Sequence, residues 1–188
     1  MNHNGRVIRV LFDEDEIAAR NIELAREIAS AGYNKLLVVA ILNGSFVFAA
    51  DLIRSLHWVC AEDEAFSAGT PSPEIAFIAA SSYVGGTESS GNVELGGFNT
   101  DVKGREVLIV DDILESGRTL AKVRGELLKR GAKKVDIAVL LRKKGKILRA
   151  LQPLKADFVG FDCPNEFVFG YGMDSAGKWR QLPHICYV

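Results

Sequence analysis

The sequence predicts an α/β fold, in which an open, mostly parallel sheet is flanked by helices. Helical and strand patterns alternate along the chain, and this alternation implies βαβ units with right-handed crossovers. The run LLVVAIL at Leu36–Leu42 is continuously apolar, as expected for a central parallel strand covered on both faces. With 188 residues, 48% of them hydrophobic, the chain is long enough to bury the core of such a layered domain.

The first predicted helix has both a start and a stop signal. Asp13 precedes its apolar positions and Glu16 follows three residues later, so the two side chains are expected to form a capping box. Gly32 is a typical helix stop. The elements predicted next are the strand Leu36–Leu42, a helix from Ser45 to about Leu56, a surface loop over residues 61–74 and a strand at Ile75–Ala80.

A long glycine-rich segment separates the two halves of the chain. Residues 81–104 contain six glycines and four serines with little apolar periodicity, a pattern typical of a functional lid or a disordered loop. No linker or internal repeat divides the sequence, so we expect one domain over residues 1–188, with a flexible loop at about 83–104. The remaining predicted elements are the strand Glu106–Val110, the helix Arg118–Arg130, the strand Val135–Leu141 and a short strand at Phe158–Phe161.

Composition narrows the class of protein. The net charge is −1, which gives no overall bias toward nucleic acid or an anionic membrane, so neither is expected as a partner. The segment Lys103–Arg149 nevertheless holds 14 basic and 6 acidic residues, which suits a small anionic ligand. Three widely spaced cysteines argue against a disulfide framework or a structural zinc site. No signal peptide or membrane-spanning stretch is evident, so a soluble cytoplasmic protein is expected.

The segment Val107–Leu120 (VLIVDDILESGRTL) carries the clearest chemical signal. An apolar strand leads to Asp111 and Asp112, and a turn of small and hydroxyl residues then opens a helix. The exposed amides of a helix N-terminus bind anions, and the Ser116 and Thr119 hydroxyls add donors. Because ionised carboxylates only accept hydrogen bonds, the two aspartates suit the vicinal hydroxyls of a sugar. Together these features predict a site for a ribose 5-phosphate.

This segment resembles the phosphoribosyl-pyrophosphate loop of type I phosphoribosyltransferases, and within them the hypoxanthine/guanine branch. The resemblance implies the fold of that family, with a small hood formed by the terminal segments. It also implies magnesium-dependent transfer of phosphoribose from phosphoribosyl pyrophosphate to hypoxanthine or guanine, and assembly as a homodimer or homotetramer. The other blocks that carry it are LNGSFVFAADL (Leu42–Leu52), SSYVGGTESSGNVEL (Ser81–Leu95), LLRKKG (Leu140–Gly145), EFVFGYGMD (Glu166–Asp174) and WRQLP (Trp179–Pro183).

The resemblance also assigns roles at the phosphoribosyl end of the site. Asp111 and Asp112 would bind the ribose hydroxyls. Glu115 would accept a proton from the purine imidazole ring, at a position where family members usually carry aspartate. Asn43 and Gly44 would meet pyrophosphate through backbone amides, since many members have lysine where this chain has Asn43. The residues expected to hold the 5′-phosphate are Glu115, Ser116, Gly117, Arg118 and Thr119.

Further roles follow by resemblance at the purine and pyrophosphate ends. Lys143 suits the purine 6-oxo group, because its ammonium donates hydrogen bonds whereas adenine presents an amino group there. Phe167 would stack on the purine, and the Val168 backbone would contact its edge. The residues assigned last are Ser82 and Tyr83, which open the loop expected to close over the site, Asp174 for Mg²⁺ and Arg180 for pyrophosphate.

Two alternatives use similar sequence features. RNA-binding regulators of pyrimidine synthesis share the fold and a VDD…TGRT loop, but the order Lys143, Phe167, Asp174 favours the enzyme. Signal-receiver domains also use an acidic pair, but they need a third aspartate after a later strand, where this chain has Arg142 and Lys143. The preference among hypoxanthine, guanine and xanthine, and the role of residues 61–72, stay open.

Overall fold

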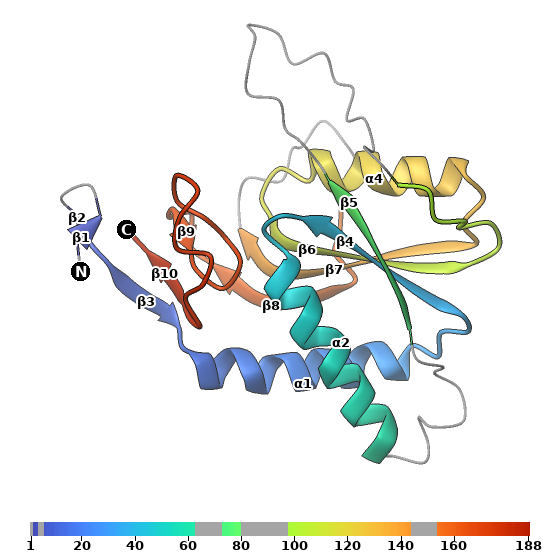
Figure 1. The fold of residues 1–188 in the computed structure, drawn as a ribbon, viewed down its shortest axis with the longest axis horizontal. Coiled ribbons are helices and arrows are strands. Elements are labelled where there is room, and N and C mark those ends of the chain that lie inside the picture. Colours follow the sequence, from blue (N-terminus) through green and yellow to red (C-terminus); the bar gives the residue numbers. More distant parts are fainter. Residues whose placement is uncertain (1, 4–5, 63–72, 80–97, 144–153) are drawn as a thin grey trace, which may run out of the picture.

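The computed structural model describes residues 2–3, 6–62, 73–79, 98–143 and 154–188 (Figure 1). Its centre is a five-stranded sheet with the strand order β5-β4-β6-β7-β8, and every neighbouring pair is parallel. This is the open parallel sheet that the sequence predicts. Its strands are β4 (Leu36–Leu42), β5 (Glu74–Ala79), β6 (Glu106–Leu114), β7 (Lys134–Lys143) and β8 (Phe158–Cys163).

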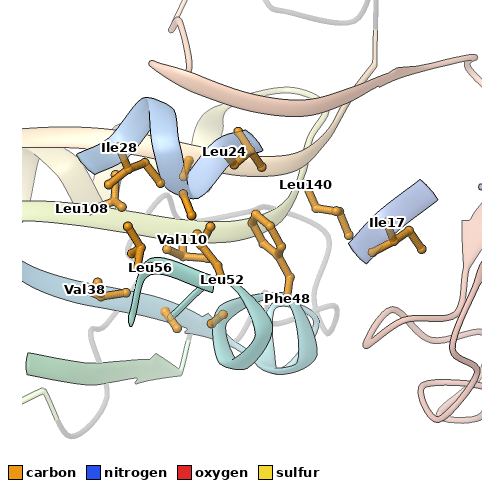
Figure 2. Packing of buried hydrophobic residues seen from close by; sticks show 14 of the residues in the cluster. Ile17, Leu24, Ile28, Val38, Phe48, Leu52, Leu56, Leu108, Val110 and Leu140 are labelled. Carbon is orange, nitrogen blue, oxygen red and sulfur yellow. The ribbon is translucent and has the colours of Figure 1, made fainter. Parts of the chain in front are cut away.

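Helices cover both faces of this sheet. The helices α1 (Glu14–Ser30) and α2 (Phe46–Glu62) pack on one face, and α4 (Arg118–Lys129) packs on the other (Figure 1). Figure 2 shows the first of these two cores, to which Leu24 of α1, Phe48 of α2 and Val110 of β6 all belong. Because each face is closed by apolar side chains, polar groups of the sheet remain accessible mainly at strand ends.

The terminal segments form a second, smaller sheet. Its strands are antiparallel, in the order β3 (Arg9–Phe12), β10 (Ile185–Tyr187), β9 (Val168–Phe169). A further antiparallel pair joins β1 (Asn2–His3) and β2 (Arg6–Val7). After β9 the chain returns to the main sheet, where Gly172 lies against the carbonyl of Gly44. The small sheet therefore brings the C-terminal segment to the carboxyl ends of the parallel strands.

Several element boundaries differ from the sequence prediction. The helix expected to end near Leu56 continues to Glu62, because Val59 extends its buried face. The strand expected to end at Val110 continues to Leu114, because its ladder with β7 runs on past the two aspartates. The predicted capping box is confirmed, since Asp13 and Glu16 exchange backbone–side-chain hydrogen bonds of 2.9 Å.

Two predicted loops fall mostly outside the described residues. Of the surface loop predicted at 61–74, residues 61 and 62 belong to α2, and Glu74 begins β5. Of the long loop predicted at about 83–104, the end is described, and Phe98 and Val102 are buried against the α4 face of the sheet. In the described ranges, no helix is both long and apolar enough to cross a membrane.

Candidate active site

A cleft of about 440 Å³ lies at the carboxyl ends of the parallel strands. It is lined by all of the residues that the sequence assigns to phosphoribosyl and pyrophosphate binding, although they come from three separate parts of the chain. The lining residues are Ile41, Leu42, Asn43, Gly44, Asp111, Asp112, Ile113, Glu115, Ser116, Gly117, Arg118, Thr119, Leu120, Asp174 and Arg180. The parallel topology explains this convergence, because strand ends meet at one edge of the sheet.

Asp111 and Asp112 form the acidic floor of the cleft. Asp111 is 9% exposed, and its carboxylate accepts a hydrogen bond of 3.1 Å from the Asp112 amide. Burial raises the pKa of Asp111 well above its ordinary value, and the negative charge of Asp112 adds to this shift. Burial also raises the pKa of Asp112, against the opposing effects of the Ile113 amide and the Arg180 charge. Ligand hydroxyls or a cation would favour the ionised pair.

The turn after β6 has the geometry of an anion site. Gly117 adopts φ +72° and is the N-cap residue of α4, whose start carries no side-chain cap. The Arg118 amide donates a long hydrogen bond of 3.5 Å to Ser116 Oγ. Ser116 and the first residues of α4 as far as Leu120 line the cleft. Such amides and the helix dipole favour a bound phosphate.

Close backbone approach fixes the loop between β4 and α2. The Leu42–Asn43 peptide is cis. A Cβ placed on Gly44 would overlap the Asp112 carboxylate, so only glycine fits there without displacing the acid. A Cβ on Gly172 would likewise overlap the Gly44 carbonyl. Glycines at these two positions let three chain segments touch around the cleft.

Asp174 and Arg180 stand on the third side of the cleft as an ion pair. Arg180 Nη2 lies 2.7 Å from Asp174 Oδ1, and Nη1 donates to the Gly172 carbonyl over 2.7 Å. The Gly177 amide donates to the other Asp174 oxygen over 2.8 Å. The structure thus brings together the two residues that the sequence assigns to magnesium and pyrophosphate. Within the described residues, no cluster of three or more His, Cys, Asp or Glu forms a self-sufficient metal site.

The purine-end residues are only partly assembled. Lys143 is the last residue of β7, is 7% exposed, and its Nζ lies 3.5 Å from Glu115 Oε1 at the cleft. Phe167 is half exposed and its ring faces that of Phe169 at a centroid distance of 6.4 Å. Val168 is buried in β9. Lys143, Phe167 and Val168 are not among the residues that line the cleft, and Ser82 and Tyr83 lie outside the described residues.

The sequence analysis did not single out two residues that shape the cleft. Gly172 sets the approach of the Gly44 loop, and its neighbour Tyr171 adopts φ +48°. The triplet Gly170-Tyr171-Gly172 in EFVFGYGMD was the available signal, because glycines on both sides of a residue indicate a backbone that needs positive φ.

Comparison with known proteins assigns the chain to a family. A family model described as the phosphoribosyl transferase domain matches residues 10–176. Hypoxanthine phosphoribosyltransferase of Escherichia coli strain K12 is 38% identical over 182 residues, covering 95% of this chain and 93% of that protein. Hypoxanthine-guanine phosphoribosyltransferase of Dictyostelium discoideum is 38% identical over 181 residues, covering 94% and 92%.

Solved structures agree with the sequence matches. The crystal structure of a hypoxanthine-guanine phosphoribosyltransferase from Bacillus anthracis is similar at a TM-score of 0.81 and 35% identity, covering 96% of this chain and 98% of that chain. The fold predicted from the sequence is therefore confirmed as the type I phosphoribosyltransferase fold. Since the family model spans most of the chain and full-length relatives share its sequence and fold, this chain belongs to the phosphoribosyltransferase family.

Proposed function

We propose that this protein transfers the 5-phosphoribosyl group from phosphoribosyl pyrophosphate to hypoxanthine or guanine, giving IMP or GMP and pyrophosphate. One observation carries the proposal: the acidic pair Asp111–Asp112 and the start of α4 line the same cleft. A diol acceptor beside an anion site matches a ribose 5-phosphate. We infer hypoxanthine and guanine as the acceptor bases from the names of the relatives from Escherichia coli and Dictyostelium discoideum.

The phosphoribosyl end of the substrate fits the residues from β6 to α4. The Asp111 and Asp112 carboxylates accept the two ribose hydroxyls, which favours their ionised form and offsets the cost of their burial. The amides from Ser116 to Thr119, with the Ser116 and Thr119 hydroxyls, hold the 5′-phosphate. Both contacts fix the sugar so that its anomeric carbon faces the incoming purine.

The pyrophosphate end fits the opposite wall. We assign the leaving group to Gly44 and Arg180, which both line the cleft, since a guanidinium can bind a diphosphate through two parallel hydrogen bonds. Asn43 carries no charge, so its contribution rests on its backbone. These contacts stabilise the negative charge that develops on pyrophosphate as its bond to the anomeric carbon of the sugar breaks and the bond to the purine nitrogen forms.

We further propose Mg²⁺ as the ion that accompanies phosphoribosyl pyrophosphate. The residue types fit, because Asp174 and the acidic pair line the same cleft, and Asp174 would exchange its ion pair with Arg180 for the ion. Magnesium usually takes one or two carboxylates and completes its shell with water and phosphate oxygens, so a protein cluster of three acids is not required. When bound, the ion neutralises part of the diphosphate charge.

At the purine end, Lys143 and Glu115 are the proposed contacts. The Lys143 ammonium donates to the 6-oxo group, and the Glu115 carboxylate accepts the proton that leaves the imidazole ring as it attacks. The 3.5 Å between Lys143 Nζ and Glu115 Oε1 supports this proposal, because two groups that close can contact neighbouring atoms of one purine. Phe167 and Val168 stay proposed contacts of the purine, and like Lys143 they are not among the residues that line the cleft.

Closure and assembly complete the proposal. The loop that begins at Ser82 and Tyr83 is proposed to cover the cleft and exclude water from the cationic sugar. We also propose a cytoplasmic homodimer or homotetramer. Support comes from the large exposed side chains Phe46 and Trp58 of α2, which line an 870 Å³ groove with α1. Light scattering of the purified protein tests the assembly, and a monomer would contradict it.

A turnover assay tests the activity. The purified protein, supplied with Mg²⁺, phosphoribosyl pyrophosphate and hypoxanthine or guanine, is expected to release IMP or GMP. Absence of product with both bases would contradict the enzyme and favour the RNA-binding regulator of the same fold. Lys143→Ala is expected to lower kcat/KM for 6-oxopurines by roughly tenfold or more, since a hydrogen bond to a charged group is lost. Lys129→Ala, at an exposed site in α4, is the matched control.

A further inference from the structure

Three polar side chains from distant parts of the sequence meet between α1 and α2, next to the cleft. Asn21 of α1 donates from Nδ2 to the hydroxyl oxygen of Tyr171 over 2.9 Å. The Tyr171 hydroxyl donates in turn to the Asp51 carboxylate of α2. Asn21 and Tyr171 are 3% and 5% exposed, so the hydrogen bond between them is shielded from water. The bond from Tyr171 to Asp51 is partly buried, since the Asp51 side chain is 29% exposed and also pairs with Arg54. Burial raises the pKa of Tyr171, and the hydroxyl therefore remains a donor.

These two hydrogen bonds of the Tyr171 hydroxyl, with Asn21 and with Asp51, form the Tyr171 clamp. The clamp holds a backbone conformation that tyrosine does not favour. Gly170, Tyr171 and Gly172 have φ values of +95°, +48° and +97°. Glycine adopts positive φ without steric cost, but the Cβ of Tyr171 is disfavoured there. The backbone of the turn is also tied at both ends, since Gly170 and Met173 exchange hydrogen bonds of 2.9 and 3.0 Å. The buried hydroxyl is thus the side-chain anchor of a turn whose central residue needs one.

The same turn positions two proposed pyrophosphate contacts. The Gly172 amide donates to the Arg180 carbonyl over 2.9 Å, and the Gly172 carbonyl accepts from the Arg180 guanidinium over 2.7 Å. On its other side, Gly172 lies against the Gly44 carbonyl. A movement of this turn would therefore displace the Arg180 charge and the Gly44 loop together.

We propose that Tyr171 is a positioning residue for the pyrophosphate end of the cleft. Its hydroxyl, clamped between Asn21 and Asp51, holds the turn against which Arg180 and Gly44 are set. Tyr171 itself does not line the cleft. This inference rests on the proposed function, because the contacts it positions are those assigned to pyrophosphate.

The test is kinetic and compares two tyrosines. Tyr171→Phe removes only the hydroxyl. It is expected to raise KM for phosphoribosyl pyrophosphate, and for pyrophosphate in the reverse reaction, by about three- to tenfold, the factor typical of one lost hydrogen bond. The KM for guanine is expected to change by less than about twofold, which is less than the effect of one typical hydrogen bond, because the turn holds no proposed purine contact.

Tyr33→Phe is the matched control. Tyr33 is also buried, and its hydroxyl also donates to a carboxylate, that of Asp136. Asp136 lies near the start of β7, at the amino ends of the parallel strands and so away from the cleft. This variant should lose similar stability with no change in either KM. Asp51→Asn keeps a side-chain acceptor for Tyr171 and should behave like the wild type, whereas Asp51→Leu should behave like Tyr171→Phe.

The outcomes separate this inference from the proposed function. Titration of each variant with phosphoribosyl pyrophosphate and Mg²⁺ measures binding without turnover. A wild type that binds but forms no nucleotide contradicts the proposed activity, and weaker binding by Tyr171→Phe alone would still support the positioning role. If the wild type is active and Tyr171→Phe matches Tyr33→Phe in both KM values, the positioning role is wrong. If the wild type neither binds nor turns over, both inferences are wrong.

Discussion

Gly44→Ala is expected to disturb the cleft through the Asp112 carboxylate. The added methyl group would overlap Asp112 Oδ2 and stand 2.6 Å from its Cγ, closer than real Cβ contacts come. Asp112 is held on β6 between the Ile113 amide and the Gly44 loop, so relief requires movement of the acid or of the loop. Overpacking of this kind costs about 1–3 kcal/mol of unfolding free energy.

The effect on binding follows from the role proposed for Asp112. A hydrogen bond to a charged group contributes about 1.5–3 kcal/mol, so loss of the ribose contact should raise KM for phosphoribosyl pyrophosphate by roughly ten- to hundredfold. Initial rates at varied phosphoribosyl pyrophosphate and saturating guanine measure this change. Denaturant unfolding measures the change in stability.

Gly125→Ala is the matched control, because it adds the same methyl group in the middle of α4 with no atom within 4 Å. It should leave KM unchanged and stabilise the protein by up to about 1 kcal/mol, the difference in helix propensity. A Gly44→Ala protein with wild-type stability and wild-type KM would refute the argument that Gly44 is required by the approach of Asp112.

Other predictions test the acidic pair and the core. Asp111→Asn should raise KM for phosphoribosyl pyrophosphate by roughly tenfold, since a hydrogen bond to a charged group is weakened, yet stabilise the unliganded fold at neutral pH. Because the folded-state pKa of Asp111 is raised, the folded state binds more protons than the unfolded state, and stability falls as pH rises above the ordinary aspartate value. The gain in Tm over wild type should therefore shrink toward about pH 4, and a gain that is equal at all pH values would contradict it. Leu108→Ala, at a fully buried site of β6, should lower the free energy of unfolding by about 2–5 kcal/mol, measured by denaturant unfolding. A smaller loss would contradict a rigidly packed core and show that α1 and α2 move into the cavity.

Most of the fold could be predicted because local patterns agree with the final structure. The capping box at Asp13, the apolar run of β4 and the strand–turn–helix around Asp111 each specify their own element. The predicted ends of elements were wrong where polar residues belong to a strand that is paired with its neighbour. Strand β6 continues through two aspartates because β7 pairs with it there, and neighbouring pairing cannot be seen in a local pattern.

Parts of the candidate site could likewise be predicted from the sequence, and other parts depend on the tertiary structure. The sequence by itself determined which segments carry the chemistry, because an acidic pair before a helix start and a lysine at a strand end are local features with direct chemical meaning. Only the tertiary structure decided how these segments are held together. The approach of Gly44 to Asp112, the ion pair of Asp174 with Arg180 and the Tyr171 clamp join residues far apart in the chain. The physical reason is that side-chain burial and backbone contact depend on packing between elements, which no single segment encodes.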